Sequence, residues 1–318
     1  MVLRRLVALA TLALVSAFAQ AQYPNKPVKI IVPWPPGGAV DTLARLIQQT
    51  VADPLGQPII IDNKPGAAGA IGSDLVAKAE PDGYTLLMAS TSVISINPNV
   101  RKLPYQPSDF SPITMVAFVP HILVINADVP ATNVKEFVAW AKANKGKVSY
   151  GSAGAGTPYH IAGEMFKKMT GVEMEQVPYK GTGPAMLDLL AGRVQIMSVE
   201  AVIALPHVKA GRLKALGIAT EKRNALAPEI PTVGEMGLPG FEITSWYGVA
   251  APVGVPKDIS ALLADKISKA LDDPAFREKL SSMGATPVGG SPEDFGRTLQ
   301  RENAKWAKAV KDAGIAIQ

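Results

Sequence analysis

Apolar residues follow two alternating spacings along the first hundred positions. Short apolar runs bounded by turn residues are typical of buried strands, whereas Leu43, Leu46 and Ile47 recur at the spacing of one helix face. The expected strands are 28–32, 58–61 and 85–90, and the expected helices are 41–51 and 70–79. This βαβαβ order predicts a parallel sheet with helices on both faces, whose ligands bind beyond the carboxyl ends of the strands.

The same pattern restarts in the second half, which predicts a second α/β unit. The expected helices there are 134–143, 159–169, 185–191 and 203–209, and the strands are 147–150, 174–177, 194–197 and 213–219. The apolar segments 121–126 and 241–250 are expected to cross between the two units as extended chain. Three helices, 256–271, 275–283 and 292–313, complete the chain. Ser291 with Asp294 three residues later predicts a capping box at the start of the last one.

The first 21 residues have the layout of a secretory signal peptide. Two arginines at positions 4 and 5 precede an apolar run over 6–18, and alanines at 17, 19 and 21 offer cleavage after Ala19 or Ala21. The apolar run is shorter than the roughly 20 residues of a spanning helix, so we expect cleavage rather than anchoring. The sequence therefore predicts a soluble protein that works outside the cytoplasm.

Composition excludes several classes of site. The chain of 318 residues has no cysteine, which excludes disulfides, thiolate zinc sites and a cysteine nucleophile. Its net charge of +5 comes from 32 basic and 27 acidic residues, and losing Arg4 and Arg5 with the signal peptide leaves 30 − 27 = +3. The basic residues are scattered and aromatic residues make up only 6%, so no nucleic-acid partner is expected.

A glycine-rich turn joins the first strand to the first helix. The sequence Trp34-Pro35-Pro36-Gly37-Gly38-Ala39 lets the backbone approach a ligand, and the start of the helix offers unpaired N–H groups and a positive dipole end. The turn therefore suits an anion. The alternative is that the two glycines only turn the chain from strand to helix.

Two further glycine-rich loops follow strands of the second unit. They are 150–160, which includes Ser152 and Thr157, and 178–184. The first of them has the spacing of neither a dinucleotide fingerprint nor a P-loop. Three such loops at strand ends in two units predict a cleft that holds a small anion from both sides.

Short motifs in a fixed order over the chain after position 22 resemble those of one protein family. In the first half they are Tyr23-Pro24, Lys26-Pro27, the Pro-x-Pro-Pro-Gly-Gly run that leads to Asp41, Asn63-Lys64-Pro65-Gly66 and Pro81-Asp82-Gly83-Tyr84-Thr85. In the second half they are Gly151-Ser152, His160, Ala162-Gly163-Glu164, Val177-Pro178-Tyr179-Lys180-Gly181, Pro231-Thr232-Val233-Gly234-Glu235 and Trp246-Tyr247-Gly248. By these motifs the chain is similar to Bug-type receptors, the periplasmic solute-binding proteins associated with tripartite tricarboxylate transporters.

The resemblance implies a fold and a function. The fold would be an α/β periplasmic-binding-protein fold of type II, with two lobes, each a mostly parallel sheet flanked by helices, and a ligand cleft between them. Lobe 1 would cover 22–122, lobe 2 would cover 123–248, and 249–318 would return to lobe 1. The function would be capture of a small carboxylate for the permease subunits of such a transporter, or for sensing. We expect a monomer without cofactor or metal.

The resemblance also implies the ligand-binding residues. In such receptors the first Gly-Gly loop and the Gly-Ser-rich loop of the second lobe hold a ligand carboxylate, partly through ordered waters. The residues implied here are Trp34, Gly37, Gly38, Ala39, Ser90, Thr91, Ser152, Ala153, Gly156, Thr157, Tyr159 and Val199. Asp41 is interpreted as a helix-start residue instead, because a carboxylate suits the helix dipole but repels an anion.

One departure from the family bears on the ligand. Relatives often have an aspartate at the position of Val199, and here Glu200 follows one place later. Since side chains alternate faces along a strand, Val199 is expected to face the cleft and favour an apolar ligand body over an amino acid. The alternative is that a local backbone adjustment turns Glu200 into the cleft. Tricarboxylates, dicarboxylates and aromatic acids are all possible ligands.

An exported hydrolase with a serine–histidine site is the other functional class. The nucleophile motif G-x-S-x-G is absent, and His121, His160 and His207 are far apart in the sequence. Triads assemble from distant positions, so the sequence leaves this alternative open. We expect a receptor rather than an enzyme.

Overall fold

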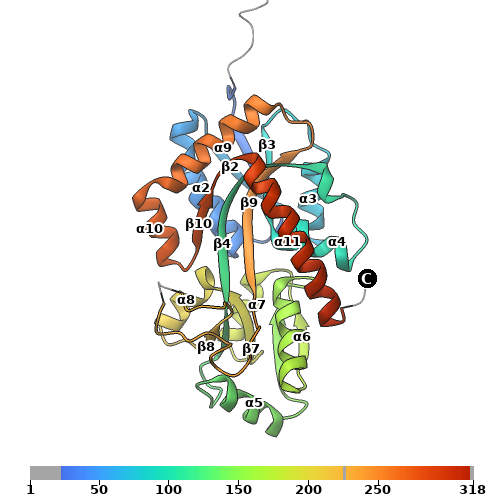
Figure 1. Ribbon diagram of the computed structural model, residues 1–318, viewed down its shortest axis with the longest axis vertical. Coiled ribbons are helices and arrows are strands. Elements are labelled where there is room, and N and C mark those ends of the chain that lie inside the picture. Colours follow the sequence, from blue (N-terminus) through green and yellow to red (C-terminus); the bar gives the residue numbers. More distant parts are fainter. Residues whose placement is uncertain (1–22, 225–226, 316–318) are drawn as a thin grey trace, which may run out of the picture.

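The computed structural model describes residues 23–224 and 227–315, and shows two lobes stacked along the long axis of the molecule (Figure 1). The predicted signal peptide over 1–21 lies outside the described residues. Among the described residues, no helix has both the length and the apolar character needed to cross a membrane.

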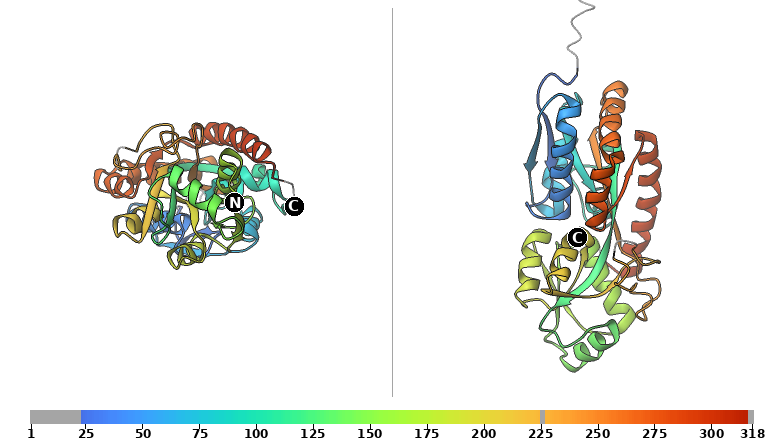
Figure 2. Two further views of the ribbon diagram at one scale, coloured as in Figure 1. Left: turned by 90° about the horizontal axis from the view of Figure 1, so that it is seen from below. Right: turned by 90° about the vertical axis from the view of Figure 1, so that its left-hand side faces the viewer.

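Lobe 1 is built on a sheet of mixed direction. Its parallel strands are β1 (Val28–Val32), β2 (Ile59–Asn63) and β3 (Thr85–Ser90), in the order β2-β1-β3. Helices α2 (Ala39–Leu55), α3 (Ala70–Ala77), α9 (Lys257–Asp272) and α10 (Pro274–Ser282) surround it (Figure 2). Ile30, Ile31 and Val32 are fully buried, because helices cover both faces of the sheet.

Lobe 2 repeats this arrangement. Strands β5 (Ser149–Ser152), β6 (Glu175–Pro178) and β7 (Ile196–Glu200) are parallel, and β8 (Leu213–Ile218) lies at the side. The helices are α5 (Val134–Ala143), α6 (Pro158–Thr170), α7 (Thr182–Leu190) and α8 (Ala201–Lys209). A separate apolar core forms here around Phe137, Phe166 and Phe241.

One long strand belongs to both lobes. Strand β4 (Phe110–Asn126) pairs antiparallel with β9 (Thr244–Pro252) and β10 (Thr286–Gly289) in lobe 1, then with β7 and β8 in lobe 2. The predicted crossing at 121–126 is the last six residues of β4, and the predicted crossing at 241–250 overlaps β9. Since β4 and β9 are antiparallel to the strands they pair with, each lobe has a mixed sheet rather than the mostly parallel one expected. The two-lobed periplasmic-binding-protein fold is confirmed.

Short segments lead from β3 toward β4 in lobe 1. They are the 3-10 turn Pro107–Asp109, the π-helical segment Ser92–Ile96 and α4 (Asn97–Val100), and a further 3-10 turn, Ala67–Gly69, precedes α3. Arg101 follows α4 directly, and this places its side chain near the loop before α6.

The last helix, α11 (Pro292–Ala313), runs from one lobe to the other (Figure 1). Ser291 caps it by accepting a hydrogen bond from the Asp294 N–H, which confirms the predicted capping box. Phe295 near its start packs in the core of lobe 1, whereas Trp306 and Val310 pack in the core of lobe 2. The helix therefore contributes to both cores.

Candidate functional site

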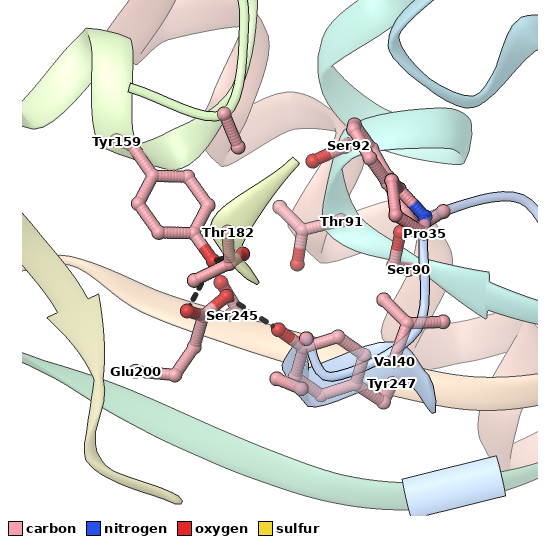
Figure 3. A pocket seen from close by; sticks show the side chains of 14 residues that line it. Pro35, Val40, Ser90, Thr91, Ser92, Tyr159, Thr182, Glu200, Ser245 and Tyr247 are labelled. Carbon is pink, nitrogen blue, oxygen red and sulfur yellow. Dashed lines mark hydrogen bonds between the residues drawn. The ribbon is translucent and has the colours of Figure 1, made fainter. Parts of the chain in front are cut away.

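A pocket lies between the lobes, where the first turns of α2, α6 and α7 meet (Figure 3). The residues that line it are Trp34, Pro35, Gly38, Ala39, Val40, Ser90, Thr91, Ser92, Ala153, Tyr159, Thr182, Glu200, Ser245 and Tyr247. Its interior volume is about 20 Å³, room for about one water molecule. The structure is therefore a closed conformation, and we call this space the inner pocket.

The start of α2 forms the lobe 1 wall of the inner pocket. Its N-cap, Gly38, provides no side-chain cap, so the first N–H groups of the helix have no partner from the cap residue. Asp41 turns away from the pocket, because its carboxylate accepts hydrogen bonds from Gly37 N, Arg45 Nε and Asn63 Nδ2 at 2.9–3.1 Å. Burial alone would raise the pKa of Asp41, but these three donors lower it. The helix start is thus left open to an anion.

Two hydroxyl residues, Ser90 and Thr91, lie at the end of β3. Thr91 Oγ1 is engaged, since it accepts from Trp246 N at 2.7 Å and donates to Trp246 O at 3.3 Å. Ser90 Oγ is buried and has no hydrogen-bond partner among the described residues. A buried hydroxyl without a partner is unfavourable, and a ligand oxygen in the pocket would satisfy it.

Glu200 is the centre of the opposite wall. Its carboxylate accepts hydrogen bonds from the hydroxyls of Tyr159 and Tyr247, the latter at 2.7 Å (Figure 3). Tyr159 also contacts the Thr182 hydroxyl. Burial, with the charge of Glu200 added to it, raises the pKa of both tyrosines well above the ordinary value, so both stay protonated donors. Glu200 is only 3% exposed, and two hydroxyl donors compensate its burial.

His121 lies behind this wall and is fully buried. Its Nδ1 is 3.2 Å from Ser198 Oγ and its Nε2 is 2.9 Å from Ser245 Oγ. Burial lowers the pKa of His121 in spite of Glu200 nearby, so the ring is neutral near pH 7. The Glu200 carboxylate is 3.8 Å from Nε2, the same nitrogen that contacts Ser245. For a triad with Ser245 the carboxylate would have to lie on the other ring nitrogen. Ser198, which lies there, is buried and does not line the inner pocket.

A second, larger space adjoins the inner pocket, and we call it the outer chamber. Its volume is about 570 Å³, and it shares Trp34, Pro35 and Ala153 with the inner pocket. Its other lining residues are Pro65, Gly66, Ala67, Ala68, Arg101, Gly154, Ala155, Tyr179 and Lys180. The cleft therefore continues from the inner pocket past Trp34.

The structure brings together seven of the twelve residues predicted for the site. Those that line the inner pocket are Trp34, Gly38, Ala39, Ser90, Thr91, Ala153 and Tyr159. Those that line neither space are Gly37, Ser152, Gly156, Thr157 and Val199.

Four of these five residues shape the loops instead. Gly37 has a positive φ of 85° and donates its N–H to Asp41. Ser152 Oγ accepts from Gln176 Nε2 at 2.8 Å, and Thr157 Oγ1 donates to Gly154 O at 2.7 Å. Gly156 donates its N–H to His160 Nδ1. The Gly37 contact holds the turn before α2, and the other contacts hold the loop before α6.

The prediction that Val199 faces the cleft is wrong. Val199 pairs with Ile122 along β4 and is fully buried, whereas Ser198 and Glu200 point to the side of His121. The strand extends to Glu200, three residues beyond its predicted end, and period-two alternation then places Glu200 in the pocket. Glu200, Ser245 and Tyr247 were missing from the predicted site, and alternation counted over 196–200 is the signal that could have identified Glu200.

Comparison with known proteins identifies the family. Residues 43–315 match the model of the tripartite tricarboxylate transporter family receptor. The chain belongs to this family. It is 36% identical to the protein BugT of Bordetella pertussis over 316 residues, which cover 98% of this chain and 96% of BugT.

Solved structures of similar proteins extend the comparison. The periplasmic binding protein BugD is 35% identical, with a TM-score of 0.89 over 93% of this chain and all of BugD. A protein of R. palustris solved with adipate is 36% identical, with a TM-score of 0.90 over 93% of this chain and all of its own. MatC from Rhodopseudomonas palustris with bound malate is 33% identical, with a TM-score of 0.85 over 91% of this chain and all of MatC. This family receptor thus has the fold of periplasmic binding proteins.

Proposed function

We propose that this family receptor binds a small carboxylic acid between its lobes and delivers it to membrane permease subunits of a tripartite tricarboxylate transporter. The observation that carries the proposal is the uncapped start of α2 beside the partnerless Ser90 hydroxyl in the inner pocket. Both supply hydrogen-bond donors to one ligand oxygen group, and the helix dipole favours a negative charge there. The adipate and malate complexes of two similar proteins support the same ligand class.

Under this proposal the predicted residues have two roles, contact with the ligand and support of the loops. Gly38, Ala39, Ser90, Thr91, Ala153, Tyr159 and Trp34 would contact the ligand or the waters around it. Gly37, Ser152, Gly156 and Thr157 would act by holding the loops, as their hydrogen bonds support. Lobe boundaries at 122/123 and 248/249, a monomeric state and cleavage of residues 1–21 are part of the proposal. Mass analysis of the exported protein tests cleavage after Ala19 or Ala21.

Thermal shift with a panel of mono-, di- and tricarboxylates, aromatic acids included, tests the proposed function. A ligand at one hundred times its Kd stabilises the folded chain by about 2.7 kcal/mol, so binders raise the unfolding temperature measurably. Calorimetry then gives each Kd. If no acid in the panel binds, the proposed function is wrong.

Hydrolysis is not part of the proposal. Ser245 and Glu200 approach the same nitrogen of His121, which does not orient the ring as a general base for Ser245. The purified protein is expected to bind acids without consuming their esters or amides. Turnover that is lost in Ser245→Ala would support the hydrolase alternative instead.

A further inference from the structure

The two spaces of the cleft differ in charge. Glu200 is the charged residue that lines the inner pocket, whereas the outer chamber is lined by Arg101 and Lys180 and by no acidic residue among those described. The remaining walls of the chamber are small or apolar side chains and Tyr179. An anion in the outer chamber would thus meet two cations and no carboxylate.

Arg101 is a partly buried cation without a carboxylate partner among the described residues. Its Nε is buried and makes no hydrogen bond, and one terminal nitrogen donates to the backbone carbonyl of Ala155 across the cleft. Burial lowers the pKa of Arg101, although a guanidinium stays protonated at physiological pH. A buried Nε–H without an acceptor is unfavourable, and an anion in the chamber would supply one. Its contacts therefore point to an acceptor that comes from outside the chain.

Lys180 brings a second cation from the other lobe. It lies in the loop between β6 and α7, and its side chain is exposed and makes no ion pair within the described part of the chain. Arg101 follows α4 of lobe 1, so the two cations approach the chamber from opposite sides. Gly181 beside Lys180 packs against Pro35, which brings the Lys180 loop next to lobe 1 in the closed conformation.

We propose that the outer chamber is a second anion subsite, in which Arg101 and Lys180 bind the distal carboxylate of an α,ω-dicarboxylate. This inference rests on the proposed function, since the first carboxylate would bind at the start of α2. The spacer would pass Trp34, Pro35 and Ala153, which line both spaces and offer apolar surface to methylene groups. A planar guanidinium suits a carboxylate because two of its N–H groups fit the two oxygens. A monocarboxylate would leave Arg101 unpaired.

Calorimetry with matched acids tests this subsite. The probes are α,ω-dicarboxylates of four to eight carbons and the unbranched monocarboxylates of the same chain lengths. The wild-type protein is expected to bind at least one dicarboxylate tenfold or more tightly than the monocarboxylate of equal length. Arg101→Met should remove most of this preference and leave monocarboxylate affinity within about threefold, because the methionine keeps the apolar stem and loses only the charge. Lys180→Met should reduce the preference less, since Lys180 is exposed.

Matched controls separate the subsite from general charge effects. Arg212→Met and Lys135→Met remove exposed cations that lie outside the cleft, and both should keep the dicarboxylate preference. If Arg101→Met does not fold, Lys180→Met and Arg101→Lys test the subsite, and the loss of preference in either supports it. Equal affinity for both acids of every pair, no binding of either, or an unchanged preference in all cleft variants would overturn the inference. A monocarboxylate or aromatic acid that still binds would leave the proposed function standing.

Discussion

Gly38 of lobe 1 faces Thr182 of lobe 2 with room for about one methyl group between them. A Cβ on Gly38 would lie 3.7 Å from both Cβ and Oγ1 of Thr182. Two further glycines make the same junction tight, because a Cβ on Gly181 would approach Pro35 to 2.8 Å and one on Gly183 would approach Pro36 O to 3.3 Å. The lobes therefore meet through small residues at the entrance of the inner pocket.

A valine at position 38 should prevent this closure. Gly38 has a φ of −88°, so alanine fits without strain and its Cβ makes an ordinary contact, but the extra methyl groups of valine would press on Thr182. We expect Gly38→Val to weaken acid binding at least tenfold, about 1.4 kcal/mol, and Gly38→Ala to change it less than threefold. Calorimetry on both variants checks this. Equal affinities for the two variants would contradict closure through this contact.

Glu200 should select ligands that carry a donor next to the carboxylate. With Val199 in the core, the argument against amino acids no longer applies, because the pocket wall holds a carboxylate acceptor. We expect Glu200→Gln to weaken an α-amino or α-hydroxy acid roughly tenfold more than the unsubstituted acid, since a hydrogen bond to a charged group contributes about 1.5–3 kcal/mol. Competition binding with both acids measures the ratio. Glu229→Gln, on the surface, is the control, and an unchanged ratio in Glu200→Gln would rule out this role.

Protonation of His121 should destabilise the fold at mildly acid pH. Burial lowers its pKa below the ordinary 6.5, so the unfolded chain binds a proton more readily than the folded chain. The stability is therefore complete above about pH 6.5 and is lost as the pH falls from there toward the folded-state pKa. One such histidine changes the free energy of unfolding by up to about 1.4 kcal/mol per pH unit. Urea unfolding between pH 5.5 and 7.5 should show this slope.

The His121 slope has its own control. His121→Gln retains polar contacts with the two serines and should flatten the dependence, whereas His207→Gln, less buried, should flatten it less. Burial also lowers the pKa of His160, so some slope should persist in His121→Gln. If His121→Gln had the wild-type slope, the pH dependence would have another source.

Thr157 should matter for the loop more than for the ligand. Its hydroxyl donates to Gly154 O and is fully buried, so Thr157→Val should lower the free energy of unfolding by about 1 kcal/mol. Thr157→Ser keeps the hydroxyl and should lose less. Chemical unfolding measures both. A large loss of ligand affinity in Thr157→Val with unchanged stability would mean that the hydroxyl turns to the ligand.

The inner pocket has to widen before it can hold an acid. An interior of about 20 Å³ is far below the roughly 300 Å³ of the smallest ordinary ligand pockets. We therefore expect the free protein to populate an open form and ligand to shift it toward the closed one. Small-angle scattering should give a smaller radius of gyration after a binding acid is added. Identical profiles with and without that acid would argue against hinge closure.

Most helices and strands, and about half of the residues that line the inner pocket, could be predicted from the sequence. Strand β3 and helices α5 and α11 have their predicted bounds, because apolar spacing and flanking turn residues agree there. The segment 110–120 of β4 was not predicted because Pro112 and Pro120 interrupt its apolar run, and β10 was not predicted because it has only four residues. Neither has enough periodicity to be detected.

The residues of the opposite pocket wall could not be predicted, because their positions depend on how the strands pair. Glu200 and Tyr247 are 47 residues apart, and only the pairing of β4 with both β7 and β9 brings their side chains together. Local spacing gives no such pairing. Thr157 and Ser152 were predicted to bind the ligand but do not line the pocket. Their hydroxyls form hydrogen bonds within the protein instead.

Helix α11 also affects the order in which the chain can fold. Trp306 and Val310 complete the core of lobe 2, although they follow its last strand, β8, by almost a hundred residues. A fragment that ends at β9 would leave the places of Trp306 and Val310 unfilled, with part of the core of lobe 2 exposed to water. Lobe 2 therefore cannot reach its native packing until α11 has docked, and until then its uncovered core can aggregate.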